Sequence, residues 1–168
     1  THTNGASKSF AMSALSTTFN SVNLGATSQE VTADGYRITL SSNGISTNAP
    51  AETASVADGV ITVKQPGVFA VTGSMNGGQI AVNVDKTAYP DGVVELELSG
   101  AELTNTNDSP IYVESIGDEV QLVAKSGTVN TISDGTSYTN SDSDNGAIYS
   151  KDDLKIKGKG TLVVNGNC

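Results

Sequence analysis

Apolar and polar residues alternate in short segments along most of the chain, which is the pattern of half-buried β-strands. In the segment 94–98, valine and leucine alternate with glutamate, so that one face of the strand is apolar. The same alternation occurs in the segments 36–40, 60–63, 68–72, 120–124 and 154–158. Apolar residues nowhere recur at helical spacing for more than about two turns. The pattern predicts an all-β protein.

The second half of the chain, residues 77–168, repeats one unit three times. Each copy is a turn of small residues, a short strand starting on isoleucine, a polar corner, a second alternating strand and a glycine. The isoleucines are Ile80, Ile111 and Ile148, and they lie roughly 30 to 40 residues apart, which is a usual period for solenoid repeats.

One copy cannot bury its apolar face alone, but copies stacked in parallel bury the faces of their neighbours. Equivalent residues of stacked strands lie about 4.8 Å apart. We therefore expect Ile80, Ile111 and Ile148 to form one internal column. A second column is expected from Leu96 or Leu98, Leu122 and Ile156. The repeat favours a parallel β-helix, or solenoid, over residues 31–168.

Asp-Gly dipeptides leave a β-sandwich as the alternative fold. Asp58-Gly59, Asp91-Gly92 and Asp134-Gly135 are typical of the tight turns that join antiparallel strands. The shared register of the copies favours the β-helix, because a sandwich has no need of it.

Residues 1–30 lie outside the repeat and are predicted to form an N-terminal arm or cap. One interpretation is a strand that covers one end of the solenoid, and the other is an extended arm that adds to the sheet of a neighbouring subunit. No capping segment follows Leu162 and Val164. We therefore expect the β-helix domain of residues 31–168 to be truncated there or completed by a neighbouring subunit.

Charge and composition argue against several classes of function. The net charge of −9 and the pI near 4.3 argue against nucleic acid binding, which needs a basic surface. No apolar run is long enough to span a membrane. The single cysteine, Cys168, cannot form an internal disulfide. Thr1 in place of an initiator methionine indicates a processed start, and we expect an extracellular or cell-surface protein.

The sequence also predicts that the protein is not an enzyme. Its only histidine, His2, lies in the N-terminal tail, so a Ser-His-Asp or Cys-His arrangement lacks a base. A lyase of the β-helix type needs a basic residue near a calcium site, whereas Arg37, the only arginine, lies outside the three repeats.

Several segments resemble a known family. The segment 68–80 (VFAVTGSMNGGQI), the segment 131–138 (TISDGTSY) and the segment 146–154 (GAIYSKDDL) are similar to the bacterial carbohydrate-binding-domain family first described in a cellulolytic clostridium. The resemblance covers roughly residues 31–168. It implies a right-handed parallel β-helix, similar to the pectate lyases, that binds calcium and plant polysaccharides such as cellulose and polygalacturonate without cleaving them.

The acidic loop that follows Asp134 is the candidate calcium site. Ca²⁺ takes six to eight oxygen ligands, which clustered aspartate and asparagine on a loop supply. Because the corners of a stacked coil align, Asp108, Asp144 and Asp152 are candidates to converge although they lie far apart in the sequence. The alternative is that these residues simply suit turns, and we favour it for Asp108. The predicted ligands are Asp134, Asp142, Asp144, Asn145, Asp152, Asp153 and Asp108.

Tyrosines and lysines are the candidate carbohydrate-binding residues, because a flat ring with one hydroxyl suits a sugar ring. Tyr112 and Tyr149 each follow a column isoleucine and should face outward, one above the other. The alternative for them is an ordinary stabilising stack. Lys155 and Lys157 face outward if their neighbours face inward. They would then bind the carboxylates of an acidic polysaccharide, or alternatively form a solvated strand face that prevents pairing at the sheet edge. Tyr138 and Tyr89 are the other candidate rings.

These observations support two hypotheses. The first is a secreted, non-catalytic β-helix module with calcium sites that binds a plant or bacterial polysaccharide. The second is a self-assembling extracellular subunit that stacks end to end into a filament, with the N-terminal arm adding to its neighbour.

Overall fold

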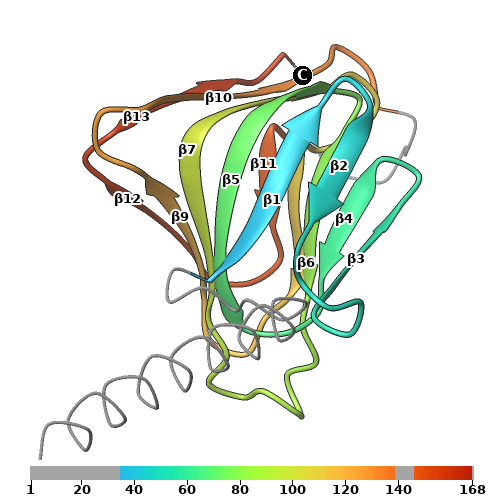
Figure 1. The fold of residues 1–168 in the computed structure, drawn as a ribbon, viewed down its shortest axis with the longest axis vertical. Helices are drawn as coiled ribbons and strands as arrows, with labels where there is room; N and C mark the ends of the chain where they lie inside the picture. The colour runs from blue at the N-terminus through green and yellow to red at the C-terminus, as the bar shows by residue number, and fades with distance from the viewer. Residues whose placement is uncertain (1–34, 139–145, 168) are drawn as a thin grey trace, which may run out of the picture. The chain divides into compact units, whose positions relative to one another are not determined.

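The computed structural model describes residues 35–138 and 146–167, which form a β-solenoid of about four turns (Figure 1). These residues form strands and turns, with no helix, and so none that could cross a membrane. The arm or cap predicted at residues 1–30 lies outside the described residues, and it stays a prediction together with its domain boundary.

The strands belong to two sheets. The eight-stranded sheet contains β1 (Tyr36–Ser41), β2 (Gly44–Thr47), β5 (Gly67–Asn76), β7 (Val94–Asn105), β9 (Val120–Ala124), β10 (Val129–Asp134), β12 (Leu154–Gly158) and β13 (Thr161–Asn165). The five-stranded sheet contains β3 (Ala54–Ala57), β4 (Val60–Val63), β6 (Gln79–Asn83), β8 (Ile111–Ser115) and β11 (Ile148–Ser150). Successive coils contribute strands to both sheets.

The register of the parallel strands confirms the predicted β-helix and its first column. Ile111 of β8 pairs with Ile80 of β6 on one side and with Ile148 of β11 on the other. The second column is also confirmed, with Leu96, Leu122 and Ile156 paired in the same way.

Antiparallel pairing among the described strands is confined to two hairpins, β1–β2 and β3–β4. The β3–β4 turn is Asp58-Gly59, whose φ angles of 50° and 77° are the positive values that a tight hairpin of this kind requires. By contrast, Asp91-Gly92 precedes β7 and Asp134-Gly135 follows β10, and each of them joins strands that do not pair with each other. The β-sandwich alternative is therefore wrong.

Each repeat has a third strand that the sequence pattern did not define. Residues 94–98 of β7 pair with β9, and after a bend residues 102–105 pair with β10. The same bend separates β9 from β10 and β12 from β13. Glycines at these bends have positive φ, among them Gly127 at 77° and Gly158 at 114°. At Gly158 a Cβ would lie 2.1 Å from the carbonyl oxygen of Ala124, so only glycine fits between adjacent coils there.

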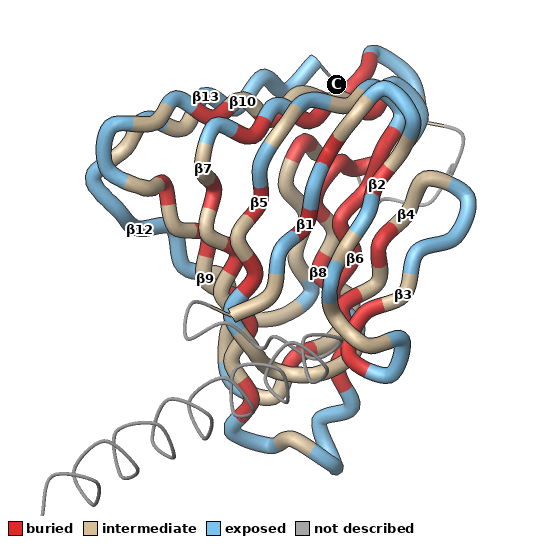
Figure 2. Tube along the Cα trace, viewed as in Figure 1, coloured by how far each residue is buried: buried red, intermediate tan, exposed pale blue. Residues whose placement is uncertain are grey.

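The core consists of the inward columns, which are red along the middle strands in Figure 2. Ile80 and Ile111 are fully buried. In the last coil, Ile156 occupies a column position and Val164 continues the column of Leu103 and Ile132, yet these two side chains are 56% and 46% exposed. The end-to-end assembly expected at this coil stays a prediction.

Buried amides connect the coils at their bends. The Asn130 side chain accepts hydrogen bonds from the backbone N–H groups of Gly100 and Ala101, both at 2.9 Å. Its Nδ2 donates to Thr128 Oγ1 at 3.0 Å and to the carbonyl oxygen of Thr161 at 3.1 Å. One asparagine therefore pairs backbone groups of the coil before it and the coil after it.

Candidate functional site

The outer face of the five-stranded sheet carries a pair of stacked tyrosines. Tyr112 of β8 and Tyr149 of β11 are paired in register, and their ring centroids are 5.8 Å apart with an interplanar angle of 12°. Both residues are half-buried. The predicted alignment of the two rings is confirmed, whereas their part in sugar binding stays a prediction.

Two charged residues complete this group, which we call the tyrosine cluster: Tyr112, Glu114, Tyr149 and Lys151. The Tyr112 hydroxyl donates to Glu114 Oε2, and Lys151 Nζ lies 2.9 Å from the same oxygen. Lys151 Nζ also lies 5.5 Å from the centroid of the Tyr112 ring, within the range of a cation–π contact. Burial and then the Glu114 carboxylate raise the pKa of Tyr112 above its ordinary value, and Lys151 opposes them.

The corner between β11 and β12 fixes the position of Lys151. The backbone N–H of Lys151 donates to the carbonyl oxygen of Val113 at 2.9 Å. The carboxylate of the next residue, Asp152, accepts from Lys86 Nζ at 2.6 Å and from the backbone N–H of Ile116 at 2.9 Å. Lys86 and then the Ile116 N–H hold the pKa of Asp152 below its ordinary value.

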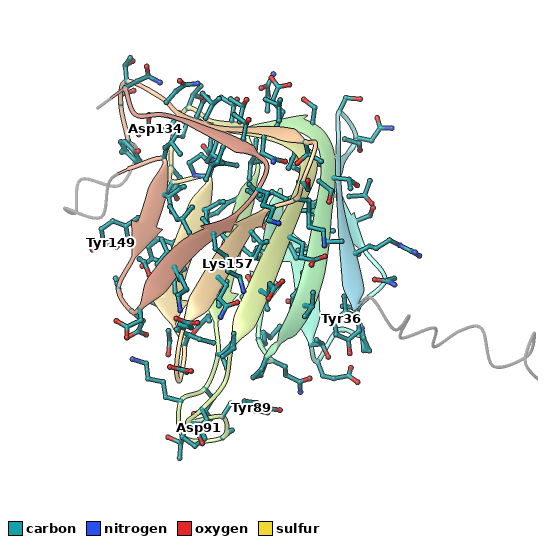
Figure 3. The ribbon with its side chains drawn as sticks, turned by 90° about the vertical axis from the view of Figure 1, so that its left-hand side faces the viewer. Tyr36, Tyr89, Asp91, Asp134, Tyr149 and Lys157 are labelled. Carbon is teal, nitrogen blue, oxygen red and sulfur yellow. The ribbon has the colours of Figure 1, made fainter. Side chains whose placement is uncertain are left out.

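Lys155 and Lys157 lie on the other sheet. Both face outward from β12, as predicted, and their neighbours in register on β9 are Gln121 and Val123. Lys155 Nζ lies 3.6 Å from a carboxylate oxygen of Glu119, and Lys157 Nζ lies 3.5 Å from one of Glu95. Figure 3 shows Lys157 and Tyr149 on separate strands, β12 and β11. The predicted tyrosines and lysines therefore do not form one surface.

Tyr138 and Asp134 brace the corner that follows β10. The Tyr138 hydroxyl donates to Asp134 Oδ2 at 2.5 Å and accepts from the backbone N–H of Gly146 at 2.8 Å. Asp134 Oδ1 accepts from the backbone N–H of Asn167 at 2.6 Å, and the Asp134 residue is only 3% exposed. Both residues therefore hold this corner through hydrogen bonds, and the roles predicted for Tyr138 in sugar binding and for Asp134 in calcium binding stay predictions.

Asp108 and Asp152 do not converge, in agreement with the turn role that the sequence favours for Asp108. Asp108 precedes β8, where its carboxylate accepts from the Ser109 N–H at 2.8 Å, whereas Asp152 follows β11 and bonds to Ile116 beyond the end of β8. The five residues of β8 separate these corners by roughly 15 Å. Corners align only with their equivalents in other coils, and each coil has several.

The other predicted calcium ligands do not complete a site among the described residues. Asp142, Asp144 and Asn145 lie outside these residues. Asp153 is exposed beside Asp152 at the β11–β12 corner. Within residues 35–138 and 146–167, no three His, Cys, Asp or Glu side chains are grouped so that they could hold a metal ion. The described ligands therefore do not fit one calcium ion, and calcium binding stays a prediction.

Sequence reasoning did not assign a role to Glu114 or Lys151. Glu114 was detectable, because it follows Tyr112 by two residues on one strand and so shares its outward face. Lys151 was not, because it lies in a corner where alternation gives no direction.

Known proteins resemble this chain in both sequence and fold. A family model described as carbohydrate-binding domain-containing protein matches residues 57–168, which include the whole tyrosine cluster. The chain belongs to this family. Another carbohydrate-binding domain-containing protein, from Acetivibrio thermocellus, is 35% identical to it over 117 residues, which are 67% of this chain and 39% of that protein.

A solved structure has the same fold as this carbohydrate-binding domain. It is a gadolinium derivative of the polysaccharide lyase-like protein from C. thermocellum, with a TM-score of 0.67 and 29% sequence identity. The similarity covers 79% of this chain and 52% of that one. The chain therefore spans about half or less of the length of the two proteins it resembles.

Proposed function

We propose that this chain is a non-catalytic, secreted module that binds a polysaccharide through the tyrosine cluster. Membership of the carbohydrate-binding family supports carbohydrate as the ligand. The stack of Tyr112 on Tyr149 is the observation that selects the surface, because it places two rings from successive coils on one outer face. The exposed parts of these rings can pack against the apolar C–H face of a sugar.

Binding without cleavage is supported by the partners of the Glu114 carboxylate in the tyrosine cluster. Glu114 receives the Tyr112 hydroxyl and pairs with Lys151, so it acts as an acceptor within a fixed network. Cleavage is the alternative to be tested, since the structural neighbour is described as polysaccharide lyase-like. A lyase would release unsaturated sugars from a uronate polymer, and these absorb ultraviolet light, whereas we expect no such product from incubation with polygalacturonate.

Native gel electrophoresis through dissolved polysaccharide tests the proposal. We expect the wild-type chain to be retarded in a gel that contains a soluble β-glucan, and Tyr149→Ala to migrate as in an empty gel. Tyr89→Ala, in the loop between β6 and β7, is the control and should still be retarded. Unretarded wild-type protein in gels of β-glucan, xylan and polygalacturonate would refute the proposed function. Retardation of Tyr149→Ala equal to wild type would show that another surface binds.

A further inference from the structure

We propose that Glu114 and Lys151 determine the specificity of the glycan site, and that they recognise sugar hydroxyl groups rather than sugar carboxylates. The inference rests on the proposed function, because it names the polar contacts and the ligand chemistry of the same site. Neither residue was among the candidates drawn from the sequence.

The first step is the location of the pair. The side chains of Lys151 and Glu114 are 38% and 41% exposed, and both contact the Tyr112 side chain. Solvent therefore reaches these charged groups beside the aromatic stack. A sugar that packs on the rings places its hydroxyl groups around the edge of the stack, where a few well-placed polar groups fix orientation.

The second step is that the pair is held in place before any ligand binds. Lys151 is fixed through its backbone bond to Val113, and the neighbouring Asp152 is tied to Lys86 and Ile116. Glu114 is held by the Tyr112 hydroxyl as well as by Lys151. Groups that are already ordered lose little conformational entropy on binding, which favours affinity.

The third step is the charge of the surface. The charges of Lys151 and Glu114 cancel, as do those of Lys86 and Asp152 beside them. The net charge of the whole chain is −9. A sugar carboxylate that approaches Lys151 also approaches Glu114, and the repulsion offsets the attraction. A hydroxyl group can donate to the carboxylate and accept from the ammonium at the same time. The pair therefore suits unsubstituted hydroxyl groups of a neutral glycan.

The lysines predicted from the sequence provide matched controls on the other sheet. Lys157 and Glu95 form a pair with side-chain exposures of 43% and 24%, and no aromatic residue occupies the β9 position in register with Lys157. Lys157→Met and Glu95→Gln therefore break a comparable ion pair without touching the tyrosine cluster.

Titration calorimetry with a soluble neutral β-glucan, and separately with polygalacturonate, tests the inference. We expect Lys151→Met and Glu114→Gln to bind the β-glucan roughly tenfold more weakly than wild type, since each loses a hydrogen bond to a charged group. Lys157→Met and Glu95→Gln should bind as wild type. Wild-type affinity for the β-glucan should change little between low and high salt, because no net charge is matched. Melting temperatures of all four variants should remain near that of wild type.

The other outcomes overturn either the inference or the proposed function. Cluster variants that bind the β-glucan as tightly as the controls refute the inference but leave the proposed function intact. Preference of the wild type for polygalacturonate, with a steep loss at high salt, shows that carboxylates are recognised and also refutes the inference. Absence of binding to both polymers, together with no retardation by xylan in the gel, refutes the proposed function itself. If Lys151→Met lowers the melting temperature, Glu114→Gln decides, because glutamine keeps an acceptor for the Tyr112 hydroxyl.

Discussion

The Asn130 side-chain amide donates to the backbone carbonyl of Thr161 in the next coil at 3.1 Å, although Asn130 is 0% exposed. Its carbonyl oxygen accepts two N–H groups of the preceding coil. Buried backbone groups need partners, and here one side chain supplies several of them.

Removal of this amide should destabilise the fold strongly. Asn130→Ala leaves the Gly100 and Ala101 N–H groups and the Thr161 carbonyl without this partner, and we expect a loss of about 2–4 kcal/mol in the free energy of unfolding. Asn165→Ala, which removes an exposed bond to Ser133 Oγ, should change it by about 0.5 kcal/mol or less. Urea denaturation measures both, and equal losses would contradict the assignment.

Because adjacent coils approach each other closely at some bends, replacing the glycine there should destabilise the fold more than replacing a glycine at an open bend. Gly73 has φ of 91° and a Cβ there would lie 2.1 Å from the carbonyl oxygen of Leu40, whereas Gly127 has φ of 77° and open space around it. Gly127→Ala should therefore cost only the conformational term of about 1–2 kcal/mol. Gly73→Ala should cost clearly more or prevent folding. Thermal unfolding compares them, and similar melting temperatures would show that the backbone at Gly73 adjusts freely.

The ion pair of Asp152 should make stability depend on acid pH. Its pKa in the folded protein is below the ordinary value, so the carboxylate contributes fully above an ordinary carboxyl pKa of about 4. The contribution is lost as the pH falls through the lower pKa of the folded state. We expect the stability difference between wild type and Asp152→Asn to be constant from neutral pH to about pH 5 and to shrink below about pH 4. Lys86→Met should raise the pKa of Asp152, as followed by carboxyl NMR.

Calcium should act through the loop rather than through the β11–β12 corner. A ligand that binds only the folded state raises the melting temperature, and we expect about 1 mM calcium to do so, as for extracellular calcium modules. The double variant Asp142→Asn, Asp144→Asn should lose this shift. Asp153→Asn should retain it, because Asp153 lies at the opposite end of β11 from the loop. Absence of a shift for the wild type would remove the predicted calcium site.

The interior of the solenoid was predictable because the same residue type recurs at the same place in each copy. The inward column could be identified because Ile80, Ile111 and Ile148 each come directly after a turn of small residues. The outward direction of Tyr112 and Tyr149 then follows, because each comes one residue after a column isoleucine. The third strand was less evident, because β7 runs through its bend as one continuous strand.

The site was only partly predictable, because alternation tells which face a residue occupies but not which corner lies near another. Asp108 and Asp152 both lie in corners, and the sequence pattern did not show that β8 separates them. The position of Lys151 depends on the neighbouring Asp152, which bonds to Lys86 some 65 residues earlier in the chain. No local sequence pattern shows a contact between residues so far apart.

The hairpins β1–β2 and β3–β4 have a consequence for how such a protein can change in length. A tandem duplication of one coil in the gene preserves every pairing when the new coil is inserted among parallel strands, because each coil offers its neighbour the same edge. At β2 and β3 the neighbouring strand runs the other way, so the copied unit would meet an edge of different geometry. Gains and losses of whole coils among homologues should therefore fall after β4.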